Sequence, residues 1–292
     1  MIAHLRQAPW IWLLVFAWLV SAIYLALAGQ GSWLVFALLS VGYELLFAWL
    51  SVRITRPMPP EPGMPRPARW RIISQLALVL VVISITGLSA TPARLPLWSG
   101  MVDELQAFGE RLLPAELVGG PGNALANPVQ YFLIPLIGLL LLGARLVELG
   151  FGRGHRAWRV SALWSALPVL TWLVVVPMGQ LPPGVLLRRL VGNALQNGFF
   201  EEFLFRGALF TRIRLVANLQ AALVIQAFLF GLWHLGPNTR LMEGDLLAGL
   251  AACIVNQTVT GLVYGILFTR TRNLLAPSVA HVMMNAFGQM FG

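Results

Sequence analysis

Long apolar stretches recur along this chain, and they constrain its fold more than any other feature of the sequence. A hydrocarbon core of about 30 Å is crossed by a helix of roughly 20 residues, so each stretch is a candidate membrane span. Nine such stretches lie at residues 9–29, 31–51, 72–90, 128–149, 160–180, 191–211, 217–236, 246–269 and 274–291. Hydrophobic residues make up 58% of the 292 positions and charged residues only 11%, whereas soluble domains carry about 25% charged residues. The sequence therefore predicts an all-α, polytopic transmembrane helix bundle with about 8–9 spans, and it excludes a soluble globular fold.

The loops between the predicted spans differ in charge. The net charge of +9 comes from 20 arginines, because the chain contains no lysine. Arginines gather in the loops 52–71 and 150–159, whereas the segment 91–127 is mainly acidic. Basic loops favour the cytoplasm, which places the N-terminus inside and the C-terminus outside, and they give no reason to expect a nucleic-acid partner. Arg188 and Arg189 conflict with this orientation, since they would lie on the outer side.

A shift in composition divides the chain near residue 160. Residues 1–159 contain about four featureless spans, a proline-rich cytoplasmic loop at 52–71 and an outer loop at 91–127. Within the outer loop, Met101–Leu113 has the apolar spacing of a helix that lies on the membrane surface. Polar groups inside predicted spans concentrate in residues 160–292. We therefore expect the functional site in this C-terminal transmembrane domain.

Two polar features lie outside that domain. Ionisable residues inside a bilayer are costly, so each one is a candidate functional residue. Glu44 lies alone in the second predicted span, and the simpler interpretation is a carboxyl group that faces a neighbouring helix. Arg145 and Glu148 are three residues apart, the spacing of an ion pair on a helix surface.

The predicted span at 191–211 contains two adjacent glutamates, Glu201 and Glu202, followed by Arg206. Glu202 and Arg206 are at positions i and i+4, so they lie on one helix face and neutralise each other. Adjacent helical residues diverge by about 100°, which points Glu201 elsewhere, without a local cation. Such a carboxylate suits the role of a general base. The alternative is that all three charges form one cluster that holds helices together.

Two later spans add two histidines and an amide. His234 ends the seventh predicted span, a place where a histidine is often only an interfacial residue. His281 and Asn285 are at i and i+4 in the last span, so they can donate hydrogen bonds to one developing oxyanion. The alternative is a polar contact between helices. Together with Glu201, these groups can activate water and stabilise a tetrahedral intermediate.

Other hydrolytic sites find less support. Cys253, the single cysteine, lies on a different span without an adjacent base, and neither a serine-centred elbow nor an HExxH motif occurs. A zinc ion held by Glu201, His234 and His281 from separate helices remains an alternative, because these are zinc-ligand types.

The ordered polar motifs resemble those of the CPBP intramembrane proteases, also called the CAAX prenyl protease or Abi family. The matching motifs are Glu201-Glu202-x-x-x-Arg206, Phe230-x-x-x-His234 and His281-x-x-x-Asn285. The resemblance covers roughly residues 160–292 and does not extend to the first four spans.

This resemblance implies an endopeptidase embedded in a cell membrane, with a membrane-associated protein or peptide as its substrate. By analogy, Glu201 is the general base, His234 helps to hold the attacking water, and His281 and Asn285 stabilise the oxyanion. Glu202 and Arg206 become the supporting ion pair. The family resemblance leaves open a metal-free, glutamate-type mechanism and a metal-dependent one. The arginine-only basic composition and apolar spans indicate a bacterial inner-membrane protein.

Two other classes of function are compatible with the same residues. A non-catalytic bacteriocin-immunity or scaffold protein could keep the fold and bind a membrane peptide, although a pure binder has no need of the set Glu201, His234, His281 and Asn285. A secondary transporter could use Glu201 and the histidines as a proton relay. The sequence contains no internal repeat of the kind that many transporters show.

Overall fold

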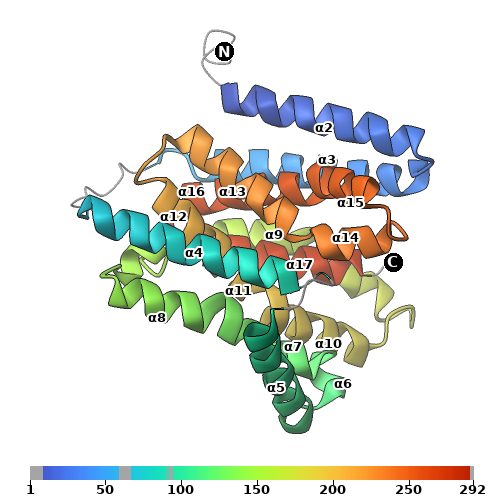
Figure 1. The fold of residues 1–292 in the computed structure, drawn as a ribbon. Coiled ribbons are helices and arrows are strands. Elements are labelled where there is room, and N and C mark those ends of the chain that lie inside the picture. Colours follow the sequence, from blue (N-terminus) through green and yellow to red (C-terminus); the bar gives the residue numbers. More distant parts are fainter. Residues whose placement is uncertain (1–8, 59–66, 90, 92–94, 290–292) are drawn as a thin grey trace.

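The computed structural model describes residues 9–58, 67–89, 91 and 95–289, and within these ranges all regular elements are helices (Figure 1). The predicted all-α, polytopic fold is therefore confirmed. Most of the proline-rich part of loop 52–71 lies outside the described residues.

Among the described residues, six helical runs are long and apolar enough to cross a membrane. Four of them are single helices, namely α2 (Pro9–Leu27), α3 (Gly31–Ile54), α4 (Arg69–Ser89) and α9 (Ala157–Val175). The fifth is the run Pro121–Leu141, made of α7 (Pro121–Pro128), η1 (Val129–Leu133) and α8 (Ile134–Leu141). The sixth is the run Leu246–Thr271, made of α15 (Leu246–Ala252), η5 (Cys253–Gln257) and α16 (Thr258–Thr271). A seventh candidate is the pair α13 (Leu219–Trp233) and α14 (Leu235–Leu241), which is bent by 49°. These seven correspond to seven of the predicted spans.

The remaining two predicted spans are helical but do not meet this test. Residues 191–211 lie within an unbroken helical run of α10 (Pro183–Asn193), η3 (Ala194–Gly198), α11 (Phe199–Glu202), η4 (Phe203–Phe210) and α12 (Thr211–Ile213). This run carries too many charged residues to count as a span by composition. The last helix, α17 (Leu275–Gly288), has 14 residues and is about 21 Å long, shorter than a hydrocarbon core. The predicted number of 8–9 spans is therefore approximate.

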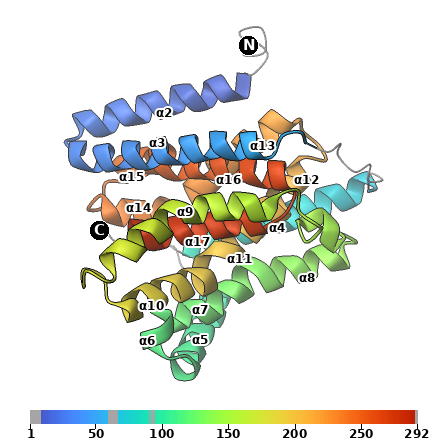
Figure 2. The same ribbon diagram turned by 180° about the vertical axis from the view of Figure 1, so that it is seen from behind.

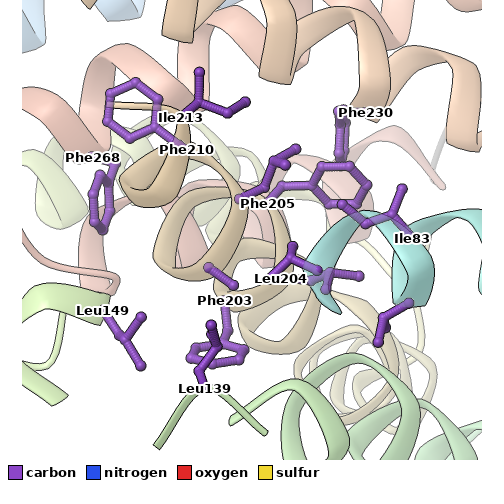
Figure 3. Close-up of a cluster of buried hydrophobic side chains, with 14 of the residues drawn as sticks. Ile83, Leu139, Leu149, Phe203, Leu204, Phe205, Phe210, Ile213, Phe230 and Phe268 are labelled. Atoms are coloured by element: carbon purple, nitrogen blue, oxygen red, sulfur yellow. The ribbon is translucent and has the colours of Figure 1, made fainter. Parts of the chain in front are cut away.

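A central core surrounds η4, all of whose residues are buried. Phe205 stacks edge-on against Phe230 of α13, and Phe210 packs in the same way against Phe268 of α16 (Figure 3). Such edge-to-face contacts add about 0.5–1.5 kcal/mol each beyond the area they bury. They fix η4 in rotation, and thereby the direction of the glutamates that precede it.

Tryptophan side chains tie helices of the N-terminal half to the C-terminal half. Trp18 on α2 donates to the carbonyl oxygen of Val255, at 3.0 Å. Trp233 on α13 donates to Oγ1 of Thr86 on α4, at 2.9 Å. Buried indole N–H groups need such partners, so each bond fixes the position of one helix against another.

The two ends of the bundle differ. In both ribbon views α2 lies outermost, next to α3 (Figures 1 and 2). At the opposite end, α5 (Pro96–Leu112) and α6 (Ala115–Val118) pack against α7 and α10 (Figure 2). The helix predicted at Met101–Leu113 is therefore present, as part of α5.

The ion pair predicted between Arg145 and Glu148 is confirmed, with Nε and Oε1 3.3 Å apart. Glu148 has a second partner that local spacing did not predict. Nη1 of Arg212, which is buried, lies 3.4 Å from Oε2 of Glu148 and 2.6 Å from Oε1 of Gln75. Arg212 of α12 therefore joins the short helix η2 (Leu146–Leu149), through Glu148, to α4, through Gln75.

Candidate active site

Four of the predicted site residues meet at one cavity. This cavity has a volume of about 490 Å³ and is lined by Glu201, His234, His281 and Asn285. They come from three different helical segments, α11, the junction of α13 with α14, and α17. The tertiary structure thus brings together groups that are up to 84 positions apart in the chain (201 to 285).

Glu201 occupies the centre of the group. Its side chain is buried, and Oε2 has no hydrogen-bond partner among the described residues. This oxygen lies 3.8 Å from Nε2 of His234 and 3.9 Å from Nε2 of His281. Both separations are too long for direct hydrogen bonds but suit a single water that bridges the polar atoms.

Glu202 contacts two cationic or proton-bearing groups at once. Its Oε1 accepts a hydrogen bond of 3.0 Å from Nη1 of Arg206 and one of 2.9 Å from Nδ1 of His281. The first contact is the predicted i,i+4 ion pair. The second was not foreseen from the sequence. Although adjacent helical residues diverge, Glu201 and Glu202 thus approach opposite nitrogens of the same imidazole ring.

Arg206 is fully buried and connects three helices. Its Nη2 donates to the carbonyl oxygen of Gly261 on α16, at 3.1 Å. The guanidinium carbon lies 4.4 Å from the centre of the Phe230 ring, within the range of a cation–π interaction. A charge inside a bundle must be paired and hydrogen-bonded, and these contacts together with Glu202 satisfy both terminal nitrogens of the guanidinium, whereas its Nε has no hydrogen-bond partner among the described residues.

His234 is oriented by its own helix. It lies at the bend between α13 and α14, and its Nδ1 is 2.8 Å from the carbonyl oxygen of Phe230. Because a carbonyl oxygen can only accept, Nδ1 carries the proton in this contact. With its single proton on Nδ1, the neutral imidazole ring has a hydrogen-bond acceptor at Nε2, and this nitrogen faces Glu201.

The cavity also contains polar residues that were not assigned to the site from the sequence. Glu44 on α3 is buried, and both of its carboxyl oxygens accept from Oγ1 of Thr260, at 2.9 and 3.0 Å. Asn197 lines the cavity one helical turn before Glu201. That i−4 spacing is a signal that sequence reasoning could have used. The position of Glu44 depends on long-range packing, so only its polarity within a span marked it.

Wide helical turns accompany the site. The described residues contain π-helical segments η1, η3, η4 and η5. Tyr131 of η1, Asn197 of η3, and Asn256 of η5 all line the cavity. Local π segments occur frequently at functional sites, because the extra residue per turn changes the direction of the side chains.

The donor atoms do not form a closed metal site as they stand. Glu201, His234 and His281 provide ligand types that zinc accepts. Bonds of about 2.0–2.1 Å in a tetrahedron would place ligand atoms about 3.3 Å apart, whereas the observed separations from Glu201 Oε2 are 3.8 and 3.9 Å. Within the described part of the chain no group of His, Cys, Asp or Glu is arranged to hold a metal ion.

Comparison with known protein families gives one match. Residues 182–287 match the family model described as "Type II CAAX prenyl endopeptidase Rce1-like". This segment includes all three polar motifs. The chain is similar to the CPBP/CAAX protease family. No curated protein and no solved structure matches the chain.

The family match indicates a general class of activity. It supports a CAAX-type intramembrane endopeptidase, which is a hydrolase that acts on membrane-associated protein substrates. The apolar helices agree with a multi-pass membrane protein. The match begins at residue 182, so it does not extend to the helices of the N-terminal half.

Proposed function

We propose that this chain is an intramembrane endopeptidase that hydrolyses peptide bonds of membrane-associated proteins with a water activated by Glu201 and His234. The observation that carries this proposal is the placement of Glu201 Oε2, buried and without a hydrogen-bond partner among the described residues, between Nε2 of His234 and Nε2 of His281. A buried base within one water's reach of two imidazoles is the arrangement that general-base hydrolysis requires.

In the first step the water donates one hydrogen bond to Glu201 and one to Nε2 of His234. Its oxygen attacks the carbonyl carbon of the scissile bond while Glu201 takes one of its protons. This forms a tetrahedral intermediate whose former carbonyl oxygen carries the negative charge. When the C–N bond breaks, Glu201 returns the proton to the leaving amine, so the base is regenerated.

The intermediate's oxyanion is stabilised by His281 and Asn285. They lie one helical turn apart on α17 and line the same cavity as Glu201. Asn285 donates through its amide group. His281 donates from Nε2 when both of its nitrogens carry protons, a state that Glu202 at Nδ1 and Glu201 near Nε2 stabilise by their charges.

Glu202 and Arg206 act as positioning residues. Glu202 holds His281 in place through the bond to Nδ1, and Arg206 holds Glu202. This chain of contacts resembles the way in which a carboxylate orients a catalytic histidine in other hydrolases. The pair is buried, so the orientation does not depend on surface charges.

The decisive experiment is cleavage of candidate membrane peptides by the purified protein and by a Glu201→Gln variant, each with and without a chelator. We expect cleavage by the wild-type protein only. A non-catalytic scaffold or a proton-coupled transporter would cleave in neither case, so absence of cleavage across a broad set of membrane peptides would contradict the proposal. The chelator arm separates a glutamate-type mechanism from a metal-dependent one, because only the latter loses activity.

A further inference from the structure

Arg188 and Arg189 conflict with the membrane orientation that the loop charges predict. In the structure they line a second cavity of about 420 Å³, between α10, the segment that joins α6 to α7, and the end of α17. Its walls also contain amide side chains and glycines, namely Asn123, Asn193, Gln196, Asn197, Gln289, Gly119, Gly120 and Gly192.

Positive charge in this cavity is not compensated. Neither Arg188 nor Arg189 forms an ion pair or a side-chain hydrogen bond with any residue that the structure describes, and no carboxylate is among the lining residues. Arg188 is exposed and Arg189 is half-buried, but Nη1 of Arg189 is itself buried and has no hydrogen-bond partner among the described residues. A buried guanidinium nitrogen without a partner is costly, so the cavity favours an anionic group with acceptor oxygens.

The backbone adds to this preference. The helical run Pro121–Leu141 begins at the cavity, with Gly120 as the residue before its first turn and Asn123 on the cavity wall. The first turn of a helix presents unpaired N–H groups and partial positive charge. Pro121 at the first helical position has no N–H group, so the anion preference of the cavity rests mainly on Arg188 and Arg189.

This cavity lies next to the candidate active site. Asn197 lines both cavities. Arg189 and Glu201 belong to one unbroken helical run, and their backbones are separated by roughly 18 Å at 1.5 Å per residue. An extended peptide advances about 3.3–3.6 Å per residue, so about five residues bridge this distance.

We propose that the cavity at Arg188 and Arg189 binds a carboxylate of the substrate, about five residues from the bond that is cleaved. This inference rests on the proposed protease function, and it names a feature of the substrate. The position of this cavity beside the active-site cavity, with Asn197 in the wall of both, favours an anion carried by the substrate over a lipid headgroup. The carboxylate is either the chain terminus or an acidic side chain, which have the same chemistry.

The test uses the full-length protein in phosphatidylcholine vesicles and one membrane-anchored peptide in four forms. The forms have a free or an amidated carboxyl terminus, each combined with Glu or Gln about five residues from the cleaved bond. Wild-type protein should cleave a form with the recognised carboxylate about 10- to 100-fold better in kcat/KM than the fully neutral form, mainly through KM. The two forms with one carboxylate identify which source is recognised.

The matched variants are Arg188→Gln combined with Arg189→Gln, and Arg159→Gln as control. Arg159 is exposed on α9 and away from both cavities. The double variant should cleave all four forms equally, at the rate at which wild-type protein cleaves the fully neutral form. The Arg159→Gln control should keep the preference for the form with the recognised carboxylate. Equal cleavage of the four forms by wild-type protein would overturn the inference, and so would a preference that survives in the double variant.

Two further arms complete the test. The first distinguishes the proposed carboxylate site from a site for a lipid headgroup. The second distinguishes failure of the carboxylate site from failure of the protease function. If phosphatidylglycerol in the vesicles stimulates wild-type protein but not the double variant, while the peptide forms are cleaved alike, the ligand is a lipid headgroup and the inference is wrong. Binding of the four fluorescent peptides to Glu201→Gln protein is measured by anisotropy. Arginine-dependent binding of the anionic forms, without cleavage by wild-type protein, would disprove the protease function and leave the carboxylate site standing.

Discussion

Nδ1 of His281 donates a hydrogen bond of 2.9 Å to Oε1 of Glu202, the same oxygen that accepts from Arg206. The other ring nitrogen lies 3.9 Å from Oε2 of Glu201. Because the two glutamates are neighbours in one helix, any rotation of that helix changes both distances together. The imidazole of His281 therefore connects the supporting ion pair to the proposed general base.

Replacement of Glu201 by Gln should remove proteolysis and leave the fold intact. The amide keeps the size of the side chain but cannot accept the proton of the attacking water. Loss of a general base reduces the rate by about 10²- to 10⁴-fold, and His234→Ala should cause a comparable loss. Initial cleavage rates measured beside thermal unfolding curves check this. Activity within threefold of wild type for Glu201→Gln would contradict the assignment.

Glu202→Ala should reduce stability as well as activity. It leaves the buried guanidinium of Arg206 without its carboxylate, and removal of one partner from a buried pair costs about 3–5 kcal/mol. Poor expression or a lowered melting temperature is the expected result, with partial recovery when Arg206→Met is added. Activity should not recover in that double variant, because His281 still lacks the acceptor at Nδ1. A Glu202→Ala protein as stable as wild type would show that the two glutamates do not divide their roles in this way.

The two arginines that contact Glu148 should differ in their contribution to stability. Arg212 is 2% exposed and also binds Gln75, whereas the side chain of Arg145 is 58% exposed. We expect Arg212→Ala to lower the free energy of unfolding by about 3–5 kcal/mol and Arg145→Ala to lower it by at most about 1 kcal/mol. Chemical unfolding in detergent provides the comparison, and equal losses would contradict it.

Membrane orientation remains a prediction from the arginine-rich loops. It places the end of α13 near the outer face, so a cysteine at Trp233 in a Cys253→Ser background should react with a membrane-impermeant thiol reagent on intact cells. A cysteine at Val216, which is exposed in the predicted cytoplasmic loop before α13, is the matched control and should react only in opened cells. The reverse pattern would place the site on the cytoplasmic side.

Local spacing in the sequence determined the features that depend on neighbouring residues. The long apolar stretches specify membrane-spanning helices because an unpaired backbone is not tolerated in lipid. The i,i+4 spacing of Glu202 and Arg206 produced the ion pair that is observed at 3.0 Å, and the i,i+3 spacing of Arg145 and Glu148 produced another at 3.3 Å. The first contact follows from α-helix geometry, whereas the second joins Arg145, the extended residue before the short helix η2, to the third residue of that helix.

Only the tertiary structure decided which distant groups meet. The contact of His281 with Glu202 joins residues 79 positions apart, and that of Thr260 with Glu44 joins residues 216 positions apart. Nothing in the local pattern sets the rotation of one helix about its axis relative to another. That rotation follows from the packing of bulky side chains such as Phe205 against Phe230, and it changes further at the π-helical turns. For the same reason Arg188 and Arg189 read as loop charges in the sequence but line a cavity in the folded chain.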